Sequence, residues 1–145
     1  MIEIYEQGPS ISGEQVDRLE EELDARLSDS YRRFLILHNG GRPDPDVIDI
    51  IGADDSPTDV QVFFGIGRAI ESSDISWNLA LVADRLPGLR LLPIACDSGG
   101  NLFCLKVVKG IASVVFYFDL NDRSRLYEVA PDFDSFWEKI RQWGQ

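Results

Sequence analysis

The chain has 145 residues, of which 44% are hydrophobic, 27% charged and 10% aromatic. This length and composition predict one soluble globular domain that buries a full hydrophobic core without disulfides or a metal. Twenty-five acidic against 14 basic residues give a net charge of −11 at pH 7, and such a surface repels phosphate backbones and anionic lipids. We therefore expect neither a nucleic acid nor a membrane as partner, and we favour a basic protein.

Other features indicate the compartment and the chemistry. No apolar run approaches the ~20 residues of a membrane span, and the N-terminus has neither the basic nor the long apolar region of a secretion signal. Cys96 and Cys104 show no CxxC spacing, which is typical of unbridged thiols in a reducing cytoplasm. With a single histidine, the chain also lacks the usual ligands of a zinc site. We expect a cytoplasmic protein with no metal and no cofactor.

Two helices are predicted near the N-terminus. In residues 12–27, apolar side chains recur three, four and four positions apart, and a Ser-x-x-Gln capping box opens the run. A shorter helix is predicted over residues 29–38, with apolar side chains on one side and with Arg32 and Arg33 facing solvent. This helix is expected to end at residues whose backbone readily adopts the left-handed conformation of a C-cap, namely Asn39, Gly40 and Gly41.

A stretch with only acidic charges follows. Residues 43–67 contain no Lys or Arg, and two short strands are predicted within them, over residues 47–51 and 60–64. A run of acidic residues is often no more than a solvated loop. The net charge points instead to an acidic docking surface for a basic protein, and both interpretations stay open. The residues that we expect to contact the partner are Asp44, Asp46, Asp54, Asp55 and Asp59.

The second half of the chain predicts mostly antiparallel sheet. After a helix over residues 74–86, strands are predicted over residues 91–96, 102–107 and 113–119, the first two joined by a hairpin turn. A last helix is predicted after Asp132, and its apolar face holds Phe133, Phe136, Trp137, Ile140 and Trp143. The order of helices, strands, helix, strands and helix indicates an α+β domain rather than repeated βαβ units.

Trp77 does not fit the apolar spacing of its own helix. Its neighbours at helical spacing, Ile75, Leu79 and Val82, form the side that is expected to face the core. Trp77 therefore either covers the edge of the core or makes an exposed contact, and the sequence leaves both alternatives open.

Two short motifs resemble catalytic signatures without their other parts. Asp97-Ser98-Gly99-Gly100 matches the surroundings of the nucleophile in trypsin-like serine proteases, but His38 has none of the local sequence expected of the base. Gly65-Ile66-Gly67 lacks the third glycine of a dinucleotide fingerprint. Turns explain both motifs better, so we expect no enzyme. An enzyme that uses paired carboxylates remains a third alternative, which a deep pocket with perturbed acids would favour.

Four segments form a longer pattern when they are taken in order. They are LSDSYRRFL at residues 27–35, NGGRP at 39–43, LPIACDSGGN at 92–101, and Val129-Ala130 ahead of two phenylalanines. A strand that ends in Asp119 comes between the last two segments. In order and spacing this pattern resembles the SUKH superfamily, in the branch that includes fungal cell-wall-synthesis regulators and many bacterial immunity proteins.

The resemblance implies one SUKH-like domain over residues 1–145, an α+β fold with a mixed, mostly antiparallel sheet and packed N-terminal and C-terminal helices. The implied function is to bind and neutralise a cognate toxin domain of a bacterial polymorphic or contact-dependent toxin system. The alternative is a non-catalytic regulatory or scaffold module inside the cell. A basic, nucleic-acid-directed toxin would suit the negative charge of this chain. In this interpretation the turn residues specify the fold, namely Asn39, Gly40, Gly41, Asp97, Gly99, Gly100 and Asn101.

Overall fold

The protein is described here by a computed structural model that covers residues 1–122 and 125–144. Its main sheet has six strands. Five are antiparallel neighbours, in the order β10 (Arg125–Ala130), β9 (Ile111–Asp119), β8 (Leu102–Val108), β7 (Leu91–Cys96) and β6 (Val62–Phe63). The sixth, β2 (Arg26–Leu27), runs parallel to β9. The sheet is therefore mixed and mostly antiparallel, which confirms the predicted fold class.

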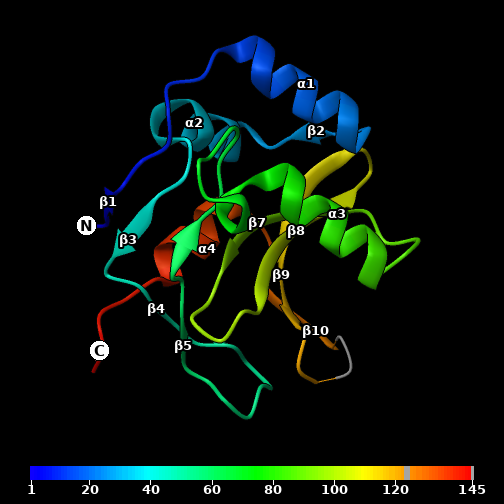
Figure 1. Ribbon diagram of the computed structural model, residues 1–145. Helices are drawn as coiled ribbons and strands as arrows, with labels where there is room; N and C mark the ends of the chain where they lie inside the picture. The colour runs from blue at the N-terminus through cyan, green and yellow to red at the C-terminus, as the bar shows by residue number, and fades with distance from the viewer. Residues whose placement is uncertain (123–124, 145) are drawn as a thin grey trace.

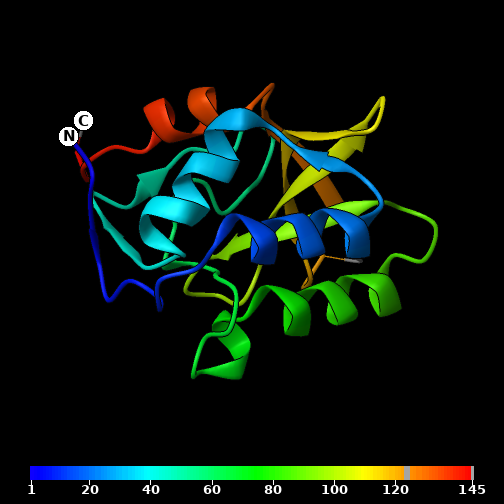
Figure 2. The same ribbon diagram turned by 90° about the horizontal axis from the view of Figure 1, so that it is seen from above.

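The described residues also form four α-helices and two small strand pairs. Seen from above, the helices lie in the order α4 (Phe133–Lys139), α2 (Asp29–His38), α1 (Gly13–Leu23) and α3 (Ile75–Arg85) (Figure 2). A 3-10 turn over Glu71–Ser73 precedes α3. Figure 1 shows the two strand pairs beside the main sheet, β1 (Glu3–Tyr5) with β3 (Arg42–Asp44) and β4 (Val47–Ile48) with β5 (Thr58–Asp59).

The helix α2 begins and ends at the predicted residues. Its C-cap, Asn39, has φ +50° and a side chain that is only 1% exposed. The Asn39 amide nitrogen donates to the carbonyls of Pro9 at 2.9 Å and Ile66 at 2.8 Å, and its amide oxygen accepts from the Ile66 N–H at 2.7 Å. The end of α2 is thereby held against the N-terminal segment and against the loop that follows β6.

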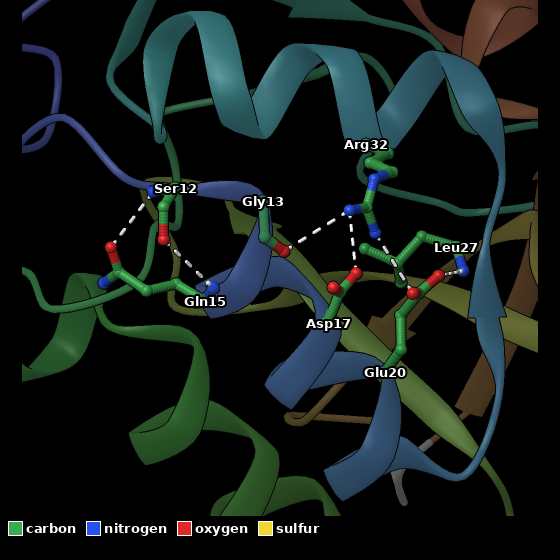
Figure 3. A network of polar contacts seen from close by, with 7 residues as sticks. All are labelled: Ser12, Gly13, Gln15, Asp17, Glu20, Leu27 and Arg32. Atoms are coloured by element: carbon green, nitrogen blue, oxygen red, sulfur yellow. Dashed lines mark hydrogen bonds and ion pairs between the residues drawn. The ribbon is translucent and has the colours of Figure 1, made fainter.

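The helix α1 is shorter than predicted. The capping box between Ser12 and Gln15 is present (Figure 3), but the helix ends at Leu23 because Asp24 adopts a left-handed backbone with φ +54°. Leu27, which the spacing placed on the same helix, belongs to β2 instead. Its side chain is 5% exposed, so a buried leucine outside the helix continued the apolar spacing by coincidence.

Arg32 was expected to face solvent, and that prediction is wrong. Its guanidinium joins α2 to α1 by donating to Asp17 at 2.8 Å, to Glu20 at 3.1 Å and to the carbonyl of Gly13 at 3.3 Å (Figure 3). The other carboxylate oxygen of Glu20 accepts from the Leu27 N–H at 2.8 Å. Two acids of α1 therefore stabilise the packing of the N-terminal elements.

The predicted strands of the second half are confirmed within two residues, whereas residues 43–67 differ more. The strands expected over residues 47–51 and 60–64 are each only two residues long, as β4 and β6, and β5 was not predicted. The strands β1, β2, β3 and β10 were not predicted either.

The apolar face of the last helix is also shorter than predicted. The helix α4 ends at Lys139, and the backbone of Arg141 then pairs with that of Val47. Phe136 and Ile140 are buried, but Trp143 is 77% exposed. The prediction that Trp143 joins the core is therefore wrong, because the chain leaves the helical spacing before it.

One hydrophobic cluster connects the helices and the sheet. The strand β7 is buried at five consecutive positions, so side chains pack on both of its faces. Between α2, β6 and α4, the rings of Phe34, Phe63, Phe133 and Trp137 lie 4.8 to 6.2 Å from one another. This aromatic group packs α2 and α4 against β6 of the main sheet.

Candidate functional site

Three loops gather at one end of the molecule, and one of them carries the predicted residues Asp54 and Asp55. The loop from β4 to β5, the turn from β7 to β8, and the segment after β9 all lie in the lower half of Figure 1, whereas α1 lies at the top. Segments more than 60 residues apart in the sequence (54–55 and 119–122) thus contribute to one surface.

Three of the five predicted acidic residues form one group. Asp44, Asp46 and Asp59 lie near the ends of β3, β4 and β5, and we call them the strand-end acids. The pKa of Asp46 is raised by partial burial and then by the negative charges of Asp59 and Asp44. Asp59 accepts hydrogen bonds from the N–H of Ser98 at 2.8 Å and from its hydroxyl. The charges of Asp59 and Asp44 therefore disfavour the charged form of Asp46, and Asp59 is tied to the β7–β8 turn.

The other two predicted residues line a separate hollow, which we call the acidic cleft. Its volume is about 310 Å³, and Asp54 and Asp55 line it from the loop between β4 and β5. Asp119 and Asp122 line it from the end of β9 and the turn that follows. Among the described residues, no Lys or Arg forms an ion pair with any of these four carboxylates. The cleft therefore concentrates negative charge that the described part of the chain leaves uncompensated.

Two tyrosines add an aromatic lining to the acidic cleft. Tyr117 comes from β9 and Tyr127 from β10. The guanidinium of Arg125 lies 5.1 Å from the centre of the Tyr127 ring, a cation–π contact. Carboxylates beside aromatic faces are a suitable environment for an arginine or lysine side chain.

A buried carboxylate binds two of the side chains that line the acidic cleft, Thr58 and Tyr117. Asp97 is 3% exposed, and one of its oxygens accepts from the N–H groups of Gly99 at 3.0 Å and Asn101 at 2.8 Å. Its other oxygen accepts from the Thr58 hydroxyl at 2.8 Å and from the Tyr117 hydroxyl. Asp97 thereby joins the β7–β8 turn to β5 and to β9, and its charge is satisfied by four donors.

Asn101 completes the same network. It is 8% exposed, donates to the Tyr117 hydroxyl at 2.9 Å and accepts from the N–H of Leu120 at 2.9 Å. Burial and the hydrogen bond to Asp97 raise the pKa of Tyr117 well above its usual range, so this hydroxyl stays protonated. The network holds the end of β9, and with it Asp119, in a fixed position beside the loop.

The predicted turn glycines lie in turns, but the physical reason for a glycine differs from one position to the next. Gly100 has φ +86°, a backbone conformation that favours glycine. Gly99 has no positive φ, and a Cβ there would make only ordinary contacts of 3.5 and 3.7 Å. At the end of α2, a Cβ on Gly40 would lie 2.6 Å from the Phe63 carbonyl oxygen, and one on Gly41 would lie 2.5 Å from a side-chain atom of Ile4. These latter two glycines allow close packing away from the acidic cleft.

Acidic residues of the same stretch do not all belong to the site. Arg141 donates twice to the Asp49 carboxylate, at 2.9 Å each, and lowers the pKa of Asp49. In contrast, Asp119 and Asp122 belong to the cleft although sequence reasoning missed them. The signal that could have found them is the Asp-x-x-Asp pair after the β9 strand, but only the fold brings it beside residues 54–55.

The described residues also indicate how far this surface could bind a metal ion or use a thiol as a nucleophile. Within residues 1–122 and 125–144, no group of three or more His, Cys, Asp or Glu is placed to hold a metal ion. Burial, followed by the charges of Asp97 and Asp59, raises the pKa of the Cys96 thiol to about 11, so this thiol is protonated and weakly nucleophilic at neutral pH. In the same ranges, we find no helix with the length and apolar character that a membrane span requires.

A family comparison bears on this site. The model of the SMI1 / KNR4 family (SUKH-1) matches residues 10–139. The matched range contains every residue of the acidic cleft and all four helices. Among curated proteins, none matches the chain.

Proposed function

The chain belongs to the SMI1/KNR4 family (SUKH-1), and on that premise we propose that it is an immunity protein. Membership supports an immunity or a regulatory role, and members of the family are generally non-catalytic. Our proposal is narrower: the protein binds a cognate toxin domain of a bacterial polymorphic or contact-dependent toxin system and neutralises it in the cytoplasm. The toxin domain is basic and acts on nucleic acid.

The acidic cleft is the observation that supports this proposal most. Its lining includes four carboxylates, and among the described residues no Lys or Arg forms an ion pair with them. A partner that brings cations to the cleft gains charge-assisted hydrogen bonds to these carboxylates. Opposite potentials also accelerate the encounter of two proteins and select against wrong partners.

A nucleic-acid-directed toxin carries the matching chemistry. Proteins of this kind hold the phosphate backbone with lysine and arginine side chains. In our proposal, Asp54 and Asp55 contact those cations together with the acidic residues after β9, so the toxin can no longer bind phosphate. The strand-end acids extend the negative surface to the other side of the β7–β8 turn.

A regulatory or scaffold module is the second candidate. The family match supports it as well, and the same acidic surface would bind several basic proteins with low affinity. The two candidates differ in selectivity, because an immunity protein protects against one toxin and a scaffold does not protect at all.

Rescue of toxicity tests the proposal. The genes next to this one are searched for a toxin-like domain, which is expressed in bacterial cells with this protein, with an unrelated acidic protein or with no partner, and surviving cells are counted. We expect survival with this protein alone. If survival with this protein is no higher than with the unrelated acidic protein, the chain is not an immunity protein for that toxin and the regulatory candidate is favoured.

A further inference from the structure

The acidic cleft is too small to be a whole protein–protein interface. Its volume of about 310 Å³ accommodates one or two side chains. A stable interface buries roughly 800 Å² on each partner, with an apolar centre inside a polar rim. If a protein partner binds at the cleft, further contact surface must lie beside it, and that surface should include exposed apolar groups.

A groove with this character lies on the other side of the β7–β8 turn. We call it the Trp77 groove; its volume is about 340 Å³, and its walls are α3 and the edge of the sheet at β6 and β7. Trp77 and Leu81 line it from α3, and Val62, Phe64 and Cys96 line it from the sheet. Trp77 is 45% exposed, so an indole ring stands half in solvent at the margin of an apolar hollow.

The Trp77 groove and the acidic cleft share one wall. Asp97 lines the groove, while the two side chains that bind one of its oxygens, Thr58 and Tyr117, line the cleft. Ser98 also lines the groove and donates to Asp59, one of the strand-end acids. A protein that covers the cleft and the strand-end acids therefore lies across the β7–β8 turn and reaches the groove.

The chemistry of the groove suits an apolar side chain. Besides the indole, its lining includes aliphatic and phenyl groups and the Cys96 thiol, whose sulfur lies 3.7 Å from the amide oxygen of Gln61. Because burial raises the pKa of that thiol to about 11, it is only weakly nucleophilic at neutral pH. Partly exposed tryptophans next to pockets are enriched among the residues that carry most of the binding free energy at interfaces.

We propose that the Trp77 groove is the apolar half of the partner interface, and that it takes an aliphatic or aromatic side chain of a basic toxin domain whose cations contact the acidic cleft. This inference rests on the proposed function. The charge of the cleft and of the strand-end acids selects a basic partner, and the groove adds an apolar anchor to that partner.

The reactivity of the Cys96 thiol can report whether this groove is covered. Cys104 is fully buried, whereas Cys96 is partly exposed in the groove. Alkylation by iodoacetamide at about pH 8.5 is followed by mass spectrometry on the free protein and on its complex with the catalytically inactive toxin domain from the rescue experiment. We expect the complex to slow alkylation of Cys96 at least about tenfold, since the bound side chain covers the groove. A Cys96→Ser variant shows that the signal comes from this thiol.

Affinity provides the second measurement. Trp77→Ala should weaken binding of the inactive toxin domain at least about tenfold, mainly through faster dissociation. Trp143→Ala is the matched control, because Trp143 is 77% exposed and lies outside the groove; its affinity should stay within about twofold of wild type. Circular dichroism and thermal unfolding verify that both variants fold.

The outcomes separate this inference from the proposed function. If the wild-type protein does not bind the toxin domain, the proposed function fails and the inference falls with it. If a complex forms but Cys96 reacts at an unchanged rate, the groove lies outside the interface and the inference is wrong. Protection of Cys96 without loss of affinity in Trp77→Ala also overturns it, since the groove would be covered but not filled.

Discussion

Two acidic regions of this molecule look alike in the sequence and differ in the structure. The helix α1 at one end carries five acids within residues 14–23, and the acidic cleft at the other end is lined by four (Figure 1). On α1, Arg32 pairs with Asp17 and Glu20, and Glu20 also accepts a backbone N–H. In the cleft, no described cation pairs with the carboxylates.

On α1, Arg32 binds two of the acids, while Glu21 and Glu22 form no ion pair with a described residue; in the cleft, the unpaired acids lie around one hollow beside two tyrosines. Acids that bind a cation of the same chain stabilise the fold, and their carboxylates are less available to a partner. Acids that gather around a hollow without a cation of the same chain attract positive charge from outside. The following predictions test whether the two regions differ in this way.

The largest expected effect belongs to Asp97, which binds two side chains of the cleft lining. Asp97→Ala leaves two hydroxyls and two backbone N–H groups without their acceptor, and each buried unsatisfied group costs about 1–3 kcal/mol. The free energy of unfolding, measured with urea, should fall by about 3 kcal/mol or more. Asp54→Ala, at an exposed position of the same cleft, should change it by less than about 0.5 kcal/mol. Equal effects of the two variants would mean that the hydrogen bonds of Asp97 stabilise the fold no more than the exposed Asp54 does.

A smaller loss of stability is expected on the α1 side. Arg32→Ala removes two ion pairs and a hydrogen bond to a backbone carbonyl. Because the Arg32 side chain is only 29% exposed, we expect the free energy of unfolding to fall by about 1–2 kcal/mol. Arg33→Ala, at the exposed neighbouring position, should have almost no effect. Loss of toxin binding in folded Arg32→Ala would show that α1 belongs to the interface after all.

The smallest effect concerns the strand-end acids. Burial and the charges of Asp59 and Asp44 raise the pKa of Asp46, so the folded state disfavours the charged form. This penalty is present above the ordinary pKa of an aspartate and absent well below it, where the group is protonated in both states. Asp46→Asn should therefore stabilise the protein at pH 7, by less than about 1 kcal/mol because solvent screens the repulsion.

Thermal unfolding at two pH values checks the prediction for Asp46. The gain from Asp46→Asn should be present at about pH 7 and disappear near pH 3. A loss of stability at pH 7 would mean that the charged form of Asp46 is stabilised by the fold, and that the strand-end acids do not repel one another.

The sequence predicted best where local signals agree. The helix α2 was predicted with its observed ends, because the apolar spacing stops at Asn39, a residue type that suits a left-handed C-cap. Where one signal continued past the end of an element, the prediction failed. Leu27 and Trp143 both extend a helical spacing, but Asp24 has already ended α1 and the chain after Lys139 pairs with β4.

The candidate site was predicted only in part, because it depends on contacts between distant segments. The acid-only stretch pointed to Asp54 and Asp55, which line the cleft. It could not show that Asp119 and Asp122 lie opposite them, since this follows from the position of β9 in the sheet. Nor could it show that Arg141, more than 90 residues away in the sequence, neutralises Asp49.

The most direct test of the account compares charge reversal in the two acidic regions. Asp54→Lys combined with Asp55→Lys, and Glu21→Lys combined with Glu22→Lys on α1, change the net charge equally at exposed positions. Titration calorimetry with the inactive toxin domain should show at least about tenfold weaker binding for the cleft variant and a change within about twofold for the α1 variant. Equal losses would mean that only the net charge matters, and an unchanged affinity of the cleft variant would remove the cleft from the interface.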